Sequence, residues 1–192
     1  MRELIRLSLF LAFACAVCGA LLALVGGSTD EARASADDAR RAKAARSVLP
    51  AFDPAEAEVS EAAEFGAFVL RKRSTGEFMG ASIEGASPHG YAGEVRLAVG
   101  FDAEGKVVDF AVVAAHETPG LGAKIGQDKF RAGVRGRPFD SLWKVSGDGG
   151  DIDAVTSATI SSRAAVEAVA DASAKFKTVA ALAAARKNRG LQ

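Results

Sequence analysis

The sequence predicts an α+β fold, in which an N-terminal transmembrane helix precedes one extracytoplasmic domain with a mainly antiparallel sheet flanked by helices. Residues 7–25 carry no charge and form a run long enough to cross a bilayer. Short turn sequences join segments of alternating or valine-rich residues, which is typical of antiparallel hairpins. Residues 160–176 then form an amphipathic run with helical spacing.

The charges around the apolar segment predict its orientation in the membrane. Arg2 and Arg6 precede it, whereas Asp30 and Glu31 follow it. The positive-inside rule therefore places the N-terminus in the cytoplasm and everything after about Gly27 outside. A cleavable signal peptide is the alternative, but its apolar core normally spans only about 7–15 residues. An uncut N-terminus in the membrane fraction would favour the anchor.

An alanine-rich helix is expected after the anchor, over residues 29–49, with acidic residues early, basic residues late and Pro50 at its end. Its role is structural, either as a stalk or as a helix that lies on the domain. The predicted organisation is a transmembrane anchor at 1–27, a helical stalk at 28–50, a folded domain at 51–180 and a C-terminal tail at 181–192.

Within the domain, hydrophobic alternation and turn residues predict strands and two helices. Phe130 is expected to face inward from a short helix, Trp143 to form core or pocket wall, and Tyr91 to share a face with Val95. Val166, Val169, Ser173 and Phe176 of the last helix are expected in the core. The predicted elements are strands at 65–72, 76–83, 91–99, 106–115 and 142–145, a loop at 85–90, and helices at 124–135 and 160–176.

Composition excludes several classes of function. The 24 basic and 24 acidic residues balance, and no basic tract indicates nucleic-acid binding. Both cysteines, Cys15 and Cys18, lie in the apolar segment, so the exported part has no disulfide, thiolate iron–sulfur site or haem-attachment motif. With only two histidines, a histidine-rich metal site is not expected. Any redox chemistry would therefore need an organic cofactor, and we predict neither a metal site nor a catalytic residue.

The segment 153–159 places Thr156, Ser157 and Thr159 at the start of the last helix. Free backbone N–H groups and the helix dipole favour phosphate at such a position. Simple N-capping, worth about 0.5–2 kcal/mol, is the alternative, but it requires only one hydroxyl. The segment therefore indicates a site for a phosphate-bearing cofactor.

A second unusual segment, 116–122, ends a strand pattern upstream and contains glycines that let backbone approach a flat ligand. Glu117 is expected to accept hydrogen bonds from the ligand or to orient a neighbouring loop. Thr118 and the N–H groups of Gly120 and Gly122 are candidates to face ligand carbonyls. An ordinary strand-to-helix turn is the alternative. Lys124 is a candidate partner for the phosphate or for an electron-rich ring edge.

Taken together, His116 to Gly122, Asp153 to Thr159 and Ile160 to Ala164 resemble the FMN-binding domain family, over roughly 91–176. The resemblance implies FMN carried on Thr159 through a phosphoester bond. Ser157 stands where the family more often has glycine. The residues implied to bind or support the cofactor are Glu117, Thr118, Gly120, Leu121, Gly122, Lys124, Thr156, Ser157, Ala158 and Thr159.

The anchor, short length and exported domain further resemble the G subunit of Rnf complexes, which are ion-translocating ferredoxin:NAD+ oxidoreductases. This resemblance implies an electron-transfer subunit, single-pass in the bacterial inner membrane, with other complex subunits as partners. It also implies a flavin transferase, using FAD and magnesium, for maturation. The alternatives are the C subunit of Na+-translocating NADH:quinone oxidoreductase, a free-standing extracytoplasmic FMN-dependent reductase, and a tethered binding module without flavin.

Overall fold

The computed structural model describes residues 2–62, 65–115, 117 and 122–189, and the chain divides into two compact units, Met1–Arg40 and Arg41–Gln192. Helix α1 (Arg2–Ser47) contains the first unit and enters the second. Its segment Ile5–Leu24, with mean hydropathy 2.5, is the one described helix that is long and apolar enough to cross a membrane. The helix expected at 29–49 is confirmed up to Ser47, and the four predicted domain ranges stay predictions.

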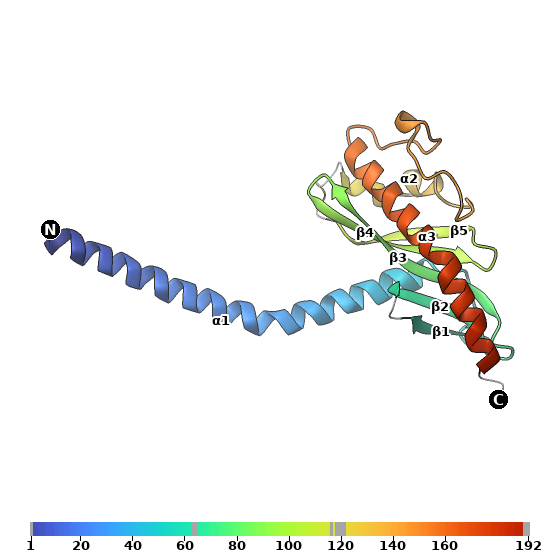
Figure 1. Cartoon of the computed structure of the whole chain (residues 1–192), viewed down its shortest axis with the longest axis horizontal. Coiled ribbons are helices and arrows are strands. Elements are labelled where there is room, and N and C mark those ends of the chain that lie inside the picture. Colours follow the sequence, from blue (N-terminus) through green and yellow to red (C-terminus); the bar gives the residue numbers. More distant parts are fainter. Residues whose placement is uncertain (1, 63–64, 116, 118–121, 190–192) are drawn as a thin grey trace. The chain divides into compact units, whose positions relative to one another are not determined.

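The second unit is built on a five-stranded antiparallel sheet in which strands adjacent in sequence are adjacent in space (Figure 1). Turns such as Asp102–Gly105, between the fourth and fifth strands, make these connections short. The sheet confirms the predicted fold class. Its strands are β1 (Ala57–Ala62), β2 (Ala67–Lys72), β3 (Phe78–Gly90), β4 (Gly93–Asp102) and β5 (Val107–Ala114).

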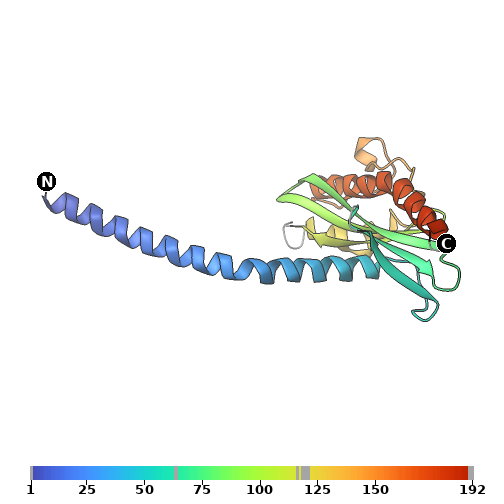
Figure 2. The same cartoon turned by 60° about the horizontal axis from the view of Figure 1, so that its bottom comes forward.

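Helix α3 (Thr159–Arg189) crosses one face of the sheet and covers the main core (Figures 1 and 2). Strand alternation directs Val95, Leu97 and Val99 of β4 into this core. The rings of Phe101 and Phe176 lie 4.9 Å apart between centroids. The predicted stripe at 166, 169, 173 and 176 is buried, so the main core lies between the helix and the sheet.

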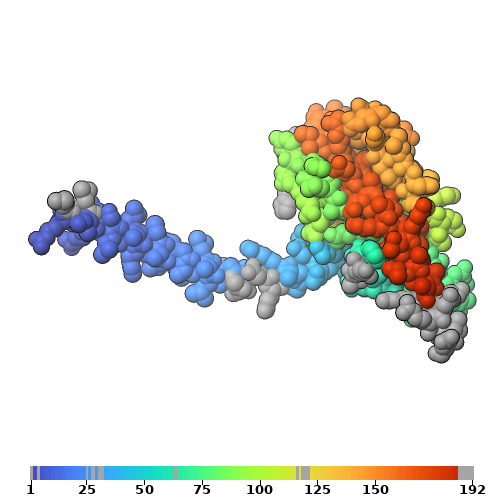
Figure 3. Space-filling view, in the orientation of Figure 1, coloured from blue at the N-terminus to red at the C-terminus, as the bar shows by residue number. Residues whose placement is uncertain are grey.

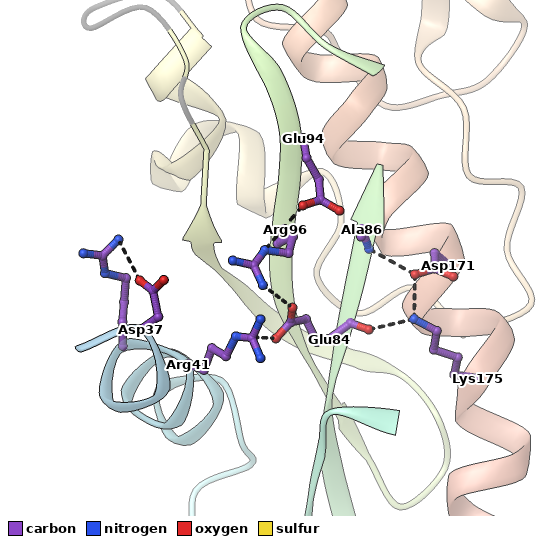
Figure 4. Close-up of polar contacts among 9 residues, drawn as sticks. Asp37, Arg41, Glu84, Ala86, Glu94, Arg96, Asp171 and Lys175 are labelled. Atoms are coloured by element: carbon purple, nitrogen blue, oxygen red, sulfur yellow. Dashed lines mark hydrogen bonds and ion pairs between the residues drawn. The ribbon is translucent and has the colours of Figure 1, made fainter. Parts of the chain in front are cut away.

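The opposite face of the sheet receives the last turns of α1. Ala44, Ala45 and Val48 pack against Ala98 and Val113, so this end of α1 lies on the domain. The helix and sheet also meet through charges, because Glu84 of β3 pairs with Arg41 at 3.7 Å and with Arg96 of β4 at 3.4 Å (Figure 4).

Two predictions about the hairpin that joins β3 and β4 are wrong. The loop expected at 85–90 is the second half of β3. A Cβ on Gly85 would overlap the backbone of Ala168 and the side chain of Ala172. The glycine at this position therefore allows close packing of the strand on helix α3, and it does not mark a loop. Tyr91 lies in the turn with 67% of its surface exposed, apart from the buried face of β4.

The segment between β5 and α3 also differs from prediction. The helix expected at 124–135 is split into the 3-10 helix η2 (Gly122–Gly126) and the short helix α2 (Asp128–Ala132), with Phe130 buried as predicted. Residues 142–145 form no strand; Val145 makes a single parallel bridge to Ile152. Trp143 packs against the core and donates its indole N–H to the Phe139 carbonyl at 3.1 Å. The tail expected from 181 continues α3.

Candidate functional site

The turn that carries the three predicted hydroxyls leads directly into α3. Helix α3 begins at Thr159, whose side chain is exposed, as are Thr156 and Ser157, whereas Ala158 is buried. The Ala158 N–H donates to the Val155 carbonyl at 2.9 Å, which closes the turn. The structure thus brings these predicted residues together at an open helix N-terminus, where an anion is favoured.

Ser157 is the one non-glycine residue with positive φ, +64°, among the described residues. L-residues disfavour this left-handed conformation because Cβ crowds the following carbonyl, and glycine adopts it without that cost. Glycine would therefore fit this position without the backbone cost that the serine here carries.

The hydroxyl of Ser162, one turn into α3, holds this turn. It accepts a hydrogen bond from the Val155 N–H at 2.9 Å and donates to the Ala158 carbonyl at 2.9 Å. Ser162 is fully buried. Its two hydrogen bonds reach the first and last residues of the turn that precedes Thr159.

The loop before this turn, orange in Figure 3, lies beside the same end of α3. Arg163 donates two hydrogen bonds to Asp148 in the 3-10 helix η3 (Ser146–Asp148), both at 2.6 Å. These hydrogen bonds hold the pKa of Asp148 below its usual value. Ser146 N–H also donates to the Ile152 carbonyl at 2.9 Å, so the glycine-rich loop closes on itself.

Glu117 is buried and both of its carboxylate oxygens are engaged within the protein. Oε1 accepts the Tyr91 backbone N–H at 2.9 Å, and Oε2 accepts the Ser161 hydroxyl at 2.7 Å. A Cβ on Gly122 would meet Glu117 Oε2 and lie 2.6 Å from Ser161 Oγ. Of the two roles expected for Glu117, the described contacts favour orientation of neighbouring segments.

Lys124 and Thr156 line the same cleft, which has a volume of about 780 Å³. Its walls come from η2, α2 and the loop before α3, and they combine basic, acidic and apolar groups. Thr159, Ser157, Ala158, Glu117 and Gly122 are not part of its lining. The lining residues are Lys124, Gln127, Lys129, Phe130, Ala132, Gly133, Asp151, Asp153, Ala154, Val155 and Thr156.

Thr118, Gly120 and Leu121, three predicted site residues, lie outside the described residues, together with His116 and Pro119. Within the described part of the chain, no group of three or more His, Cys, Asp or Glu side chains is placed to hold a metal ion. Sequence reasoning gave no role to Ser161, Ser162 or Arg163. The available signal was that Ser162 lies four residues before Val166, in line with the buried stripe of the last helix.

Comparison with known proteins gives the same family as the motifs. Residues 90–174 match the model of the FMN-binding domain. The G subunit of the ion-translocating oxidoreductase complex of Pseudomonas aeruginosa is 33% identical over 186 residues, which cover 88% of this chain and 86% of that protein. The chain belongs to the family of these G subunits.

Other G subunits align over a shorter region. That of Shewanella baltica is 42% identical over 105 residues, 52% of this chain and 50% of that protein, so the chain spans about half the length of these relatives. Among solved structures, the crystal structure of Shewanella oneidensis NqrC aligns with a TM-score of 0.47 and 17% identity, over 70% of this chain and 72% of that one. In this member of the G-subunit family, the region that matches the FMN-binding domain includes both Glu117 and Thr159.

Proposed function

We propose that this protein is an electron-transfer subunit of a membrane-bound, ion-translocating ferredoxin:NAD+ oxidoreductase. One observation supports this most directly: an exposed threonine hydroxyl, Thr159, opens α3 within the region that matches the FMN-binding domain. The protein is a non-autonomous subunit in this proposal, and other subunits supply and receive its electrons.

FMN is proposed to be attached to Thr159 by a phosphoester. A flavin transferase would use FAD and magnesium: Thr159 Oγ1 loses its proton and bonds to the flavin-side phosphorus, while the diphosphate P–O bond breaks and AMP leaves. The helix dipole alone stabilises a phosphate by only about 0.3–2 kcal/mol, which is too little to retain a cofactor in an open compartment. A covalent bond prevents its loss.

The cleft that Lys124 and Thr156 line is proposed to hold such a group. Its volume of about 780 Å³ lies within the usual range of small-ligand sites, and the half-buried Ala154 and Val155 offer apolar surface to a flat ring. Lys124 and Thr156 provide polar groups at its edges. Leu121, Gly122, Ser157 and Ala158 are proposed to complete the surroundings, and Glu117, Thr118 and Gly120 to support them. When bound, FMN supplies the redox chemistry, and these residues supply position and electrostatics.

The apolar segment Ile5–Leu24 is proposed to anchor the protein as a single-pass subunit of the bacterial inner membrane. Arg2 and Arg6 before it support a cytoplasmic N-terminus, with the FMN-binding domain on the outer side of the membrane. The other subunits of the complex and the flavin transferase are the expected partners.

Flavin fluorescence on a denaturing gel tests covalent attachment. The full chain, co-expressed with a flavin transferase, should give a fluorescent band, and Thr159→Ala should give none. Thr178→Ala is the matched control, because it removes another exposed threonine hydroxyl from the same helix, outside the proposed site, and should keep the band. A dark wild-type band would reject the covalent flavin. Mass spectrometry of subunits copurified from native membranes then tests the assignment to the complex.

A further inference from the structure

Three consecutive side chains in the first turn of α3 each hold a different segment of the site. Ser161 contacts Glu117, Ser162 contacts the turn that ends at Ala158, and Arg163 contacts Asp148. We propose that Ser162 is a positioning residue for flavin attachment, which fixes the turn that presents Thr159 to the transferase. This inference rests on the proposed attachment of FMN to Thr159.

Apart from Ser162, the turn is held by the hydrogen bond from the Ala158 N–H to the Val155 carbonyl and by packing of Val155 against the core. Thr156, Ser157 and Thr159 are exposed, so their side chains add no core packing. Ser157 also holds a left-handed backbone conformation that costs free energy. Since three of its side chains are exposed and its backbone is strained, hydrogen bonds from α3 add stability to this one conformation.

Ser162 provides that constraint from within the helix. Its buried hydroxyl spans the turn, with Val155 N–H at one end and the Ala158 carbonyl at the other, both at 2.9 Å. The Ser162 N–H donates to the same Ala158 carbonyl at 2.9 Å, so the turn and the helix share one acceptor. Loss of the hydroxyl would leave Val155 N–H without this acceptor and free the turn to sample other conformations.

The side chains on either side of Ser162 hold two further segments of the site. Ser161 Oγ reaches Glu117, which also accepts the backbone N–H of Tyr91 from the β3–β4 turn. Arg163 holds the glycine-rich loop through Asp148. Reaction of a threonine with a phosphorus centre depends on a narrow approach geometry, and small misplacements of reacting groups cost large factors in rate.

The test measures the rate of flavin attachment to full-length apo-protein in detergent, with purified transferase, FAD and magnesium. Ser162→Ala removes only the hydroxyl, and we expect attachment to slow by about tenfold or more. The matched control is Ser173→Ala on the same helix, because Ser173 is equally buried but its hydroxyl has no hydrogen-bond partner among the described residues. That control should react at the wild-type rate.

A second control separates positioning from stability. Val169→Ala leaves a cavity in the core beneath α3 and lowers the unfolding temperature without touching the turn. It should keep the wild-type rate of attachment even where its loss of stability equals or exceeds that of Ser162→Ala. Equal slowing in the two variants would overturn the inference, as would a wild-type rate in Ser162→Ala.

Hydrogen exchange of the apo-protein gives a readout that does not depend on the cofactor. In Ser162→Ala the amide of Val155 should exchange faster than in wild type, whereas amides in β4 should be unchanged. Unchanged exchange at Val155 would contradict the inference. A wild-type protein that accepts no flavin at all would instead reject the proposed function itself, so the two failures are distinguishable.

Discussion

Ser161 Oγ donates a 2.7 Å hydrogen bond to Oε2 of Glu117, although 44 positions separate the two residues in the chain. Both side chains are buried, and this bond joins the segment after β5 to the first turn of α3. Because Glu117 also accepts the Tyr91 N–H, one carboxylate connects three segments around the candidate site. A charged acceptor with two protein donors is a strong local constraint.

Removal of that carboxylate should destabilise the domain. Glu117→Ala leaves the Tyr91 N–H and the Ser161 hydroxyl without their acceptor, and we expect a loss of about 1–3 kcal/mol in the free energy of unfolding. Glu117→Gln should lose less, because a serine hydroxyl can rotate to accept from the new amide. Urea unfolding followed by circular dichroism measures both. Equal losses for the two variants would argue against these hydrogen bonds as the cause.

A methyl group on Gly122 should disturb the same contact. The added Cβ would overlap Glu117 Oε2 and approach Ser161 Oγ to 2.6 Å, so Gly122→Ala should cost about 1–3 kcal/mol of stability. Gly126→Ala is the matched control at the other end of η2, where Cβ would find Val112 at an ordinary 3.5 Å. Thermal unfolding of the two variants is the measurement. A similar melting temperature for both would show that the segment can move aside.

The sequence was sufficient to predict an antiparallel sheet, the buried stripe of α3 and a start of that helix at 160, one residue after the observed Thr159. These features depend on local periodicity and on the choice of residues at the helix N-terminus. Gly85 was misread because glycine serves both loops and close packing, and only the fold shows that Ala168 and Ala172 lie opposite it. Strand β1 was not predicted, since its sequence AEVSEA is short and polar, as edge strands often are.

The candidate site shows the same division between local and long-range information. The hydroxyl cluster at 156–159 could be found in the sequence because its members are neighbours. The partners of Ser161 and Arg163 could not, because they depend on which loops the fold brings to α3. For Glu117, the alternatives of ligand contact and loop orientation stayed open until both of its oxygens had partners in the structure.

Replacement of Ser157 by glycine should stabilise the protein slightly. The left-handed φ of +64° costs an L-residue about 1–2 kcal/mol, while glycine adds about 0.5–1 kcal/mol of chain entropy to folding, so the net gain is up to about 1.5 kcal/mol. Ser157→Val should be clearly destabilising, because β-branched residues are least compatible with positive φ. Urea midpoints for the three proteins should follow the order glycine, serine, valine, and a reversed order would contradict the assigned conformation.

Asp109 of β5 should make stability depend on acid pH. Burial raises its pKa, but hydrogen bonds from Arg131, Arg135 and the Phe110 N–H outweigh burial and hold the pKa below its usual value. With the folded pKa depressed, the carboxylate contributes fully above the unfolded value of about 3.9 and its contribution is lost as the pH falls through the folded pKa. Asp109→Asn should therefore lose about 1–3 kcal/mol at pH 7 and show a shallower decline in acid.

The comparison that tests this is the free energy of unfolding at pH 7 and at pH 3 for wild type, Asp109→Asn and the control Glu104→Gln, whose side chain is exposed in the β4–β5 turn. Wild type and the control should lose similar amounts of stability between the two pH values, and Asp109→Asn should lose less. Glu167, whose pKa is also lowered by hydrogen bonds from Ser87 and His89, keeps part of the acid dependence in every variant. An equally steep decline in Asp109→Asn would show that the contacts of Asp109 with Arg131 and Arg135 do not govern the acid response.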